Sequence, residues 1–166
     1  MSENTDRTEA ITKLSEIIKD INVAMLTTAM PDGTLRSRPM MTQQTEFDGD
    51  LWFFTGASSP KVHEIEEDQH VNLSYAAPDD NRYVSVSGRA TLVRDRQKAE
   101  ELWKPMYKAW FPEGVDDPDL SLLKVSVEQA EYWDTSSNTF VHLVGFAKAV
   151  ATGERYQPGD NEKINL

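Results

Sequence analysis

The sequence predicts a mainly β protein, an antiparallel barrel that is closed or nearly closed, with α-helices inserted between its strands. Three observations lead to this fold class. About six short runs are rich in β-branched and aromatic residues, and turn signals separate them at short spacing. In one run Val84 and Val86 alternate with Ser85 and Ser87, as in a half-buried strand. Between the runs, a few segments carry apolar residues at helical spacing.

The N-terminal half should begin with a helix and continue as a three-strand meander. Ile11, Leu14, Ile17, Ile18 and Ile21 fall near one helical face at a spacing of about 3.6 residues. Turns follow the first and second strands, where proline fixes φ or glycine accepts a positive φ. The expected strands are residues 23–30, 36–44 and 51–55, the turns are residues 31–33 and 48–49, and a short helix covers residues 59–68.

The C-terminal half should add further strands and two helices. Gly88 lies in the middle of a strand, where a bulge or a barrel corner is expected. Asp95 is a preferred N-cap for the next helix, and Gly153 should end the last one. The expected strands are residues 70–77, 83–94, 122–127 and 130–134, and the helices are residues 96–109 and 140–151. We expect one domain over residues 1–155 and a polar C-terminal tail over residues 156–166.

The composition suits a soluble, cytoplasmic protein. The chain has 166 residues, of which 39% are hydrophobic and 27% are charged, which fits one globular domain. Its formal net charge of −11 argues against a nucleic-acid partner. No stretch approaches the ~20 apolar residues that cross a membrane, and the acidic start does not resemble a secretory signal. With no cysteine and with three histidines far apart, no metal site is expected.

A candidate anion site follows the third expected strand. Ser59 is a preferred N-cap and Pro60 a preferred first helical residue, so free backbone N–H groups and the positive end of the helix dipole face the residues before them. Lys61 adds a full positive charge. The same residues also fit a plain helix cap beside a solvated lysine. The candidate contacts in this segment are Phe54, Thr55, Ser58, Ser59 and Lys61.

A second signal lies on the strand before it. Arg36 and Arg38 are two residues apart, so they share one face of the strand. Pro39 has no N–H to give to a sheet, so the strand should be an edge or contain a bulge. Two exposed arginines on an edge strand are the plain alternative to a binding role.

Taken together, these segments resemble the pyridoxamine 5′-phosphate oxidase-like split-barrel family, and its general stress protein branch in particular. The Thr-x-x-x-Ser-x-Lys spacing after an aromatic strand is fairly specific, and the resemblance covers residues 10–155. The segments that carry it are Arg38-Pro-Met40, Phe53-Phe-Thr-x-x-x-Ser59-x-Lys61, His63-x-Ile65, His70-Val-Asn-Leu-Ser74, Trp110-Phe-Pro112, Asp117-Pro118 and Ala130-Glu-Tyr-Trp-Asp134.

The resemblance implies a split barrel that binds FMN, in a homodimer with the flavin between the subunits. Arg38 and its neighbours Pro39 and Met40 would then contact the isoalloxazine and ribityl parts, where a guanidinium stabilises the charge that develops on reduction. Tyr83 falls where the oxidases have a flavin-contacting glutamine, and Trp133 falls near their flavin-side tryptophan. The phosphate would be held by Phe54, Thr55, Ser59 and Lys61, with Ser58 beside them.

Departures from the oxidases narrow the expected function. The oxidases follow their tryptophan with an Arg-x-His pair for the substrate phosphate, whereas Asp134 and polar residues follow Trp133 here. Gln43 replaces a lysine of the oxidases. Each lost cationic anchor should weaken binding of an anionic substrate by about 1.5–3 kcal/mol. We therefore expect an FMN-dependent oxidoreductase of unknown substrate linked to the stress response, and not an authentic pyridoxamine phosphate oxidase.

Two alternatives remain open at this point. The chain also fits a non-catalytic FMN carrier or redox sensor, or a structural dimer with a vestigial site. No general acid or base stands out in the sequence, so no catalytic residue is assigned. The aromatic residues Trp103, Tyr107, Trp110 and Phe111 recur at helical spacing, which favours a core or dimer contact, with a flavin-covering role for Trp110 or Phe111 as a further hypothesis.

Overall fold

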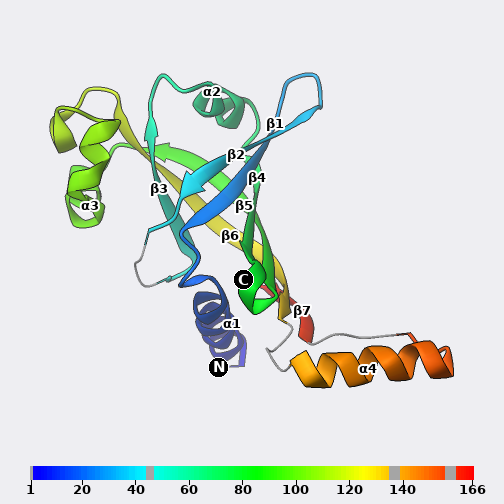
Figure 1. Ribbon diagram of the computed structural model, residues 1–166. Helices are drawn as coiled ribbons and strands as arrows, with labels where there is room; N and C mark the ends of the chain where they lie inside the picture. Colours follow the sequence, from blue (N-terminus) through cyan, green and yellow to red (C-terminus); the bar gives the residue numbers. More distant parts are fainter. Residues whose placement is uncertain (1, 44–46, 135–138, 156–159) are drawn as a thin grey trace.

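The computed structural model describes residues 2–43, 47–134, 139–155 and 160–166. It is built around a strongly curled sheet with helices at its ends and flank (Figure 1). The elements in chain order are α1 (Ser2–Ile18), β1 (Val23–Ala29), β2 (Leu35–Met41), β3 (Asp50–Gly56), α2 (Pro60–Glu67), β4 (His70–Ala77), β5 (Arg82–Val93), α3 (Arg96–Leu102), β6 (Leu120–Asp134), α4 (Thr139–Thr152) and β7 (Asp160–Asn165).

The sheet has the strand order β2-β1-β4-β5-β6-β3, and β7 pairs with the far end of β6. Every pairing is antiparallel. Within the described residues, β2 pairs only with β1 and β3 only with β6, so the barrel is open along a seam between β2 and β3. The curl brings these two end strands near one another without pairing them. This architecture confirms the predicted antiparallel split barrel.

A bulge at Gly88 bends the longest pair of strands. The register between β5 and β6 shifts between Ser87 and Gly88, as the mid-strand glycine predicted. A Cβ on Gly88 would lie 2.2 Å from the backbone oxygen of Ser126, so no larger residue fits without moving β6. The bulge therefore needs glycine for close approach of two backbones.

The core fills the inside of the barrel. The alternating inward residues of the strands are almost completely buried, among them Leu26, Phe53, Leu73 and Val86. Leu14 and its helical neighbours on α1 join the same cluster, so α1 closes one end of the barrel, and α2 lies at the other end (Figure 1). The apolar helical face predicted for the first segment is therefore a core face.

Three sequence-based expectations need correction. The helix expected over residues 96–109 ends at Leu102, because Pro105 forces Lys104 into an extended conformation and a short 3-10 turn follows. The two strands expected at residues 122–127 and 130–134 are one continuous strand, β6. The polar tail expected from residue 156 contains β7, in which Ile164 is 7% exposed.

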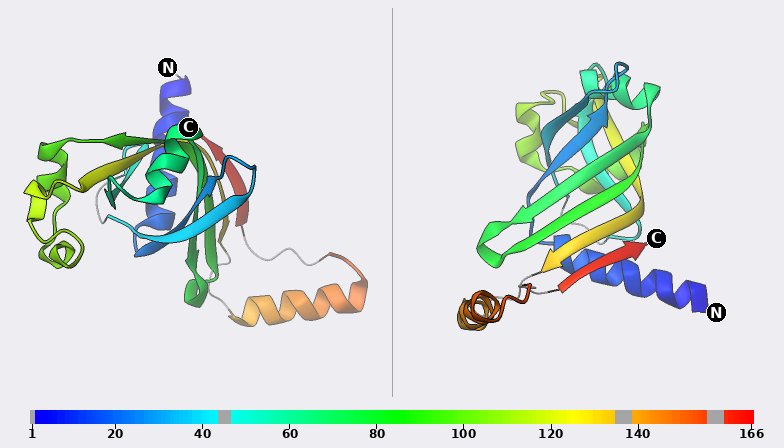
Figure 2. Two further views of the ribbon diagram at one scale, coloured as in Figure 1. Left: turned by 90° about the horizontal axis from the view of Figure 1, so that it is seen from above. Right: turned by 90° about the vertical axis from the view of Figure 1, so that its right-hand side faces the viewer.

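The last helix lies away from the barrel. Figures 1 and 2 show α4 projecting beyond the end of the sheet. Its sequence is largely apolar, and Phe146 and Val150 are exposed. Gly153 ends the helix with a φ of 72°, as predicted. Among the described residues, none of the helices has the length and apolar character needed to span a membrane.

Candidate functional site

A cavity of about 400 Å³ lies along the seam of the barrel. β2 and β3 form two of its sides, and the segment after α3 forms a third. The structure brings half of the predicted cofactor residues to this cavity. Those that line it are Pro39, Met40, Phe54, Thr55 and Lys61.

One wall of the cavity is aromatic. The ring centroid of Phe54 lies 4.9 Å from that of Tyr107 and 6.5 Å from that of Phe111. Such tilted contacts hold rings in fixed positions. The Tyr107 hydroxyl donates a hydrogen bond of 3.2 Å to Oε1 of Gln43, which fixes that amide at the cavity edge. Trp110 stands at the mouth with 62% of its surface exposed. Tyr107, Trp110 and Phe111 thus lie on a 3-10 turn and the following loop, which pack onto β3, and not on a continuous helix.

The other end of the cavity meets the first turn of α2. Ser59 has the extended conformation of an N-cap and Pro60 is the first helical residue, as predicted. The Ser59 side chain makes no capping bond; its Oγ instead accepts a hydrogen bond of 2.8 Å from Nζ of Lys61. Ser59 and Lys61 are therefore held together at the start of the helix, where the positive end of the helix dipole favours an anion. The N–H groups of Ser59 and Val62 are already bonded to the backbone oxygens of Gly56 and Ser59.

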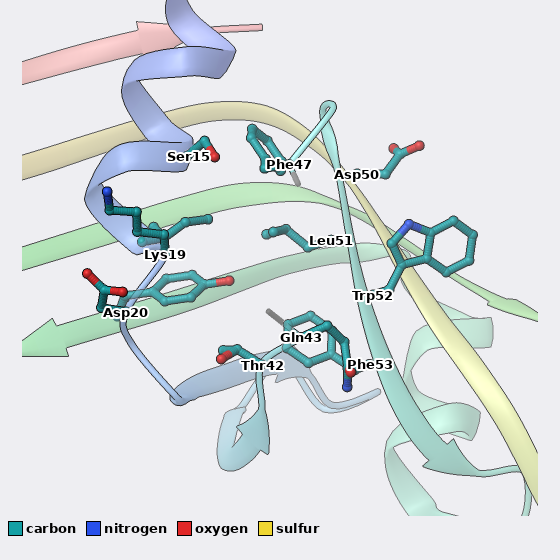
Figure 3. Close-up of a pocket in the computed structure, with 12 residues that line it drawn as sticks. Ser15, Lys19, Asp20, Thr42, Gln43, Phe47, Asp50, Leu51, Trp52 and Phe53 are labelled. Carbon is teal, nitrogen blue, oxygen red and sulfur yellow. The ribbon is translucent and has the colours of Figure 1, made fainter. Parts of the chain in front are cut away.

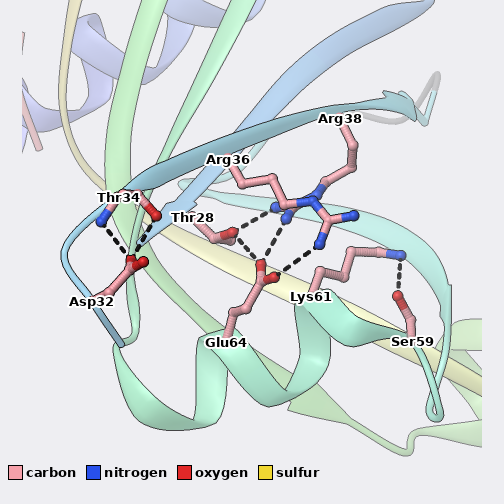
Figure 4. Close-up of polar contacts among 8 residues, drawn as sticks. All are labelled: Thr28, Asp32, Thr34, Arg36, Arg38, Ser59, Lys61 and Glu64. Carbon is pink, nitrogen blue, oxygen red and sulfur yellow. Dashed lines mark hydrogen bonds and ion pairs between the residues drawn. The ribbon is translucent and has the colours of Figure 1, made fainter. Parts of the chain in front are cut away.

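Sequence reasoning missed a buried carboxylate at this end of the cavity. Glu64 is 5% exposed and lies one turn after Lys61 on α2 (Figure 4). Nη2 of Arg38 donates to its Oε2 at 2.6 Å, and Nη1 of Arg36 lies 3.5 Å from its Oε1. One feature of the sequence could have indicated its burial: Glu64 lies between Val62 and Ile65 on the inner face of a short amphipathic helix.

A threonine completes this cluster. Oγ1 of Thr28 donates to Oε2 of Glu64 at 2.6 Å and accepts from Nη1 of Arg38 at 2.7 Å. Arg36 and Arg38 lie on one face of β2, as the i, i+2 spacing predicted, and that face meets α2 (Figure 4). The guanidinium of Arg38 is thereby fixed beside α2, where its charge acts on Lys61, although Arg38 itself does not line the cavity.

The charges at this end do not balance. Burial lowers the pKa of the Lys61 ammonium and the charge of Arg38 lowers it further, while Glu64 acts in the opposite direction. Burial acts to raise the pKa of Glu64, but hydrogen bonds from Thr28 and Arg38 outweigh it, so the pKa lies below its ordinary value. Three cations therefore face one ionised carboxylate, an excess of two positive charges in a chain of net charge −11.

Ser58 is placed differently from the other predicted phosphate contacts. Its backbone N–H donates to Oδ1 of Asp119 at 3.0 Å, and the N–H of Ala57 donates to the backbone oxygen of Asp119 at 2.7 Å. The bonds from Ser58 hold the pKa of Asp119 below its usual range. Two backbone donors of the predicted cradle are thus engaged by Asp119, which sequence reasoning did not pair with this loop.

Tyr83 and Trp133 lie outside the cavity. They face each other in register across β5 and β6, and each is 41% exposed. Both belong to the outward face of the sheet, since the residues beside them point into the core. The structure therefore brings these two predicted residues together with each other and not with Lys61.

A second cavity of about 300 Å³ lies between the end of α1 and the start of β3 (Figure 3). None of the predicted cofactor residues lines it. Its Lys19 is accompanied by Asp20 and Asp50, so it carries no excess of positive charge. Gln43 lines both cavities. Of these two cavities, the seam cavity is therefore the one better suited to an anionic ligand. Among the described residues, no cluster of three or more potential metal-binding side chains occurs.

Comparisons with known proteins identify relatives of this chain. The family model described as pyridoxamine 5′-phosphate oxidase like matches residues 9–157. The chain is 31% identical over 156 residues to protein bli-3 of Neurospora crassa, covering 88% of this chain and 75% of that one. It is 27% identical over 113 residues to general stress protein 26 of Bacillus subtilis, covering 65% of this chain and 80% of that one.

A solved structure shares the fold. The general stress FMN/FAD binding protein of Xanthomonas citri superposes with a TM-score of 0.68 at 26% identity, over 79% of this chain and 92% of that one. The split barrel is thus common to this chain and to a protein named for flavin binding.

Proposed function

Because the chain belongs to the pyridoxamine 5′-phosphate oxidase-like family, we propose that it binds FMN in the cavity along the seam between β2 and β3. The observation that carries this proposal is the division of that cavity into a cationic end at α2 and an aromatic end at Phe54 and Tyr107. A flavin mononucleotide has the same two parts, a phosphate and a flat ring system.

The cationic end suits a terminal phosphate. A phosphate monoester carries a charge of about −1.5 to −2 at neutral pH, which matches the local excess of positive charge. Lys61 and the Ser59 hydroxyl supply donors, and the positive end of the α2 dipole favours the negative charge. Arg38 contributes its charge from the same end. We therefore assign Arg38 to the phosphate end, and not to the ring as the resemblance first implied.

The aromatic end suits the isoalloxazine. Phe54, Phe111 and Met40 offer flat or flexible apolar surface, and Trp110 stands where it covers the cavity mouth. A volume of about 400 Å³ lies within the range of small-molecule sites. When bound, the flavin supplies hydride or electron transfer. These residues orient the ring and exclude water from one of its faces.

The substrate is not a pyridoxamine phosphate in this proposal. Asp134 follows Trp133 at the position of the oxidase substrate arginine, and a carboxylate there repels a phosphate. Gln43 replaces a lysine of the oxidases, and its amide oxygen accepts a hydrogen bond from the Tyr107 hydroxyl. An uncharged or cationic electron acceptor or donor fits these changes better, with a role in the stress response suggested by the relatives.

We also propose a homodimer. Val23, Met25 and Met41 form an exposed apolar strip on neighbouring positions of β1 and β2, continuous with the outward face that carries Tyr83 and Trp133. A second copy covering this face brings its Tyr83 and Trp133 toward the seam cavity. Sedimentation equilibrium checks this: a monomer at micromolar concentration contradicts it.

A non-catalytic FMN carrier or sensor is the second candidate. The described residues that line the cavity include no histidine, aspartate or glutamate, the usual general acids and bases. Anaerobic mixing of the FMN-loaded protein with NADH or NADPH separates the candidates. Rapid bleaching of the flavin supports an oxidoreductase, and a persistent yellow colour supports a carrier.

Substitution of Lys61 tests the site itself. Lys61→Ala should raise the Kd for FMN about 10- to 100-fold, because it removes one charged hydrogen bond to the phosphate. Lys108→Ala, which removes an exposed lysine outside the cavity, is the matched control. Equal FMN affinity of the wild type and the Lys61 variant, measured by flavin fluorescence, contradicts the proposed site. A protein that stays colourless after FMN addition and desalting contradicts flavin binding altogether.

A further inference from the structure

We propose that Glu64 is a positioning residue that fixes the guanidinium of Arg38 beside Lys61, and that this pairing makes the protein select flavins that end in a phosphate over riboflavin. The inference rests on the proposed FMN site. It concerns a residue that touches neither ring nor phosphate and that acts through Arg38.

The geometry leaves Arg38 little freedom. Its two terminal nitrogens are each engaged, one with Glu64 at 2.6 Å and one with Thr28 at 2.7 Å. Thr28 is itself bonded to the same carboxylate oxygen at 2.6 Å, so the three side chains close a ring of hydrogen bonds. Thr28 and Glu64 are buried, and the side chain of Arg38 is 18% exposed. Charge-assisted bonds of this kind are short, strong and directional.

Without Glu64, Arg38 would lose its ionic partner and keep the weaker, uncharged hydrogen bond to Thr28. Arg38 lies on β2, a strand at the edge of the sheet, and a long arginine side chain there is otherwise free to turn toward solvent. Arg36, two residues earlier on the same face, shows this: it reaches Glu64 only at 3.5 Å and its side chain remains 56% exposed. Arg38 is the fixed arginine because its contact with Glu64 is short and because it also bonds Thr28.

Glu64 also makes two neighbouring cations compatible. Arg38 and Lys61 lie close enough for the charge of one to lower the pKa of the other, while the carboxylate opposes that effect. In the absence of a ligand, the pair would separate if Glu64 were lost. With Glu64 in place, both charges stay at the α2 end of the cavity, ready for a group that carries two negative charges.

A merely structural role for Glu64 predicts something different. If the carboxylate only stabilised the packing of α2 on β1 and β2, its loss would loosen the whole cavity and lower the affinity for all flavins alike. A positioning role affects only the ligand that has the phosphate. Riboflavin, which has the same ring and ribityl chain without the phosphate, therefore separates the two.

The experiment compares FMN and riboflavin affinities, by quenching of flavin fluorescence, for four proteins. These are the wild type, Glu64→Ala, Thr28→Val and the control Glu66→Gln, which changes an exposed carboxylate on the same helix. We expect Glu64→Ala to raise the Kd for FMN about 10- to 100-fold and to leave the Kd for riboflavin within about twofold of the wild-type value. Thr28→Val, which keeps shape and removes one bond from Arg38, should weaken FMN less, and Glu66→Gln should match the wild type.

Each outcome has one meaning. Unchanged FMN affinity in both Glu64→Ala and Thr28→Val overturns the inference and leaves the FMN site intact. An equal loss for FMN and riboflavin assigns Glu64 a structural role and also overturns it. If Glu64→Ala does not fold by circular dichroism, the milder Thr28→Val decides by the same ratio. Wild-type protein that binds neither flavin overturns the proposed function, and the inference with it.

Discussion

Replacing Gly88 by alanine tests a close backbone approach in the barrel, at the bulge in the pairing of β5 and β6. A Cβ at this position would lie 2.2 Å from the backbone oxygen of Ser126, 3.0 Å from its carbonyl carbon and 3.2 Å from Cα of Val127. Ordinary contacts of a Cβ begin at 3.4 Å, so β6 has to retreat by roughly 1 Å. The obstacle is backbone in a paired strand and not the end of a flexible side chain, so little of the strain can relax.

Overpacking by one methyl group usually costs about 1–3 kcal/mol. Because a paired strand has to move, we expect the upper end, about 3 kcal/mol. For a domain of this size each kcal/mol lowers Tm by about 2–4 °C, so the variant should melt about 6–12 °C below the wild type. Thermal unfolding followed by circular dichroism measures the difference.

Gly33→Ala is the matched control. Gly33 has a φ of 84° and nothing within 4 Å of its position for a Cβ, so only backbone strain of about 1–2 kcal/mol opposes the change. Gly88→Ala should therefore be clearly less stable than Gly33→Ala. Equal melting temperatures of the two variants would contradict the close approach of β5 and β6 at Gly88. A Tm of Gly88→Ala within about 2 °C of the wild type would contradict it as well.

Two further predictions concern the cavity and its charges. Trp110→Ala should raise the Kd for FMN about 2- to 10-fold in a fluorescence titration, because one aromatic cover is lost. Met106→Ala, which changes an exposed residue outside the cavity, should leave the Kd unchanged. Equal FMN affinities of the Trp110 variant and the wild type would remove Trp110 from the site. The pKa of Glu64 is held below its ordinary 4.5, so the unfolded state binds more protons near that pH. The stability that Glu64 contributes is therefore complete above about pH 4.5, and it is lost as the pH falls through the folded-state pKa. The difference in unfolding free energy between the wild type and Glu64→Gln, from urea denaturation, should shrink over that acid range, and a difference that stays constant would contradict the pairing.

The sequence predicted what is encoded locally. The Ser59-Pro60 helix start, the Asp95 cap, whose carboxylate accepts the N–H of Lys98 at 3.0 Å, and the bulge at Gly88 each follow from the preferences of one or two residues. The i, i+2 spacing placed Arg36 and Arg38 on one face of their strand, and Pro39 indicated an edge strand or a bulge.

The parts that were missed depend on partners far along the chain. Glu64 meets Arg38 across 26 residues, and Asp119 meets Ser58 across 61, so neither pairing has a local signature. β7 reads as a polar tail because it lies at the end of the sheet, with one buried residue, Ile164, to mark its inner side. The break at Pro105 was visible in the sequence, but the aromatic spacing around it favoured a longer helix.

The open seam has a consequence for behaviour in solution. Among the described strands, β2 and β3 each leave one edge unpaired, and an unpaired edge is a template on which another extended chain can add a strand and start aggregation. β2 carries two devices that oppose such growth: Pro39 withholds an N–H, and Arg36 and Arg38 place like charges along the strand. The residues that shape the cavity thus also guard a vulnerable edge, so substitutions at Pro39 should be judged by solubility as well as by ligand affinity.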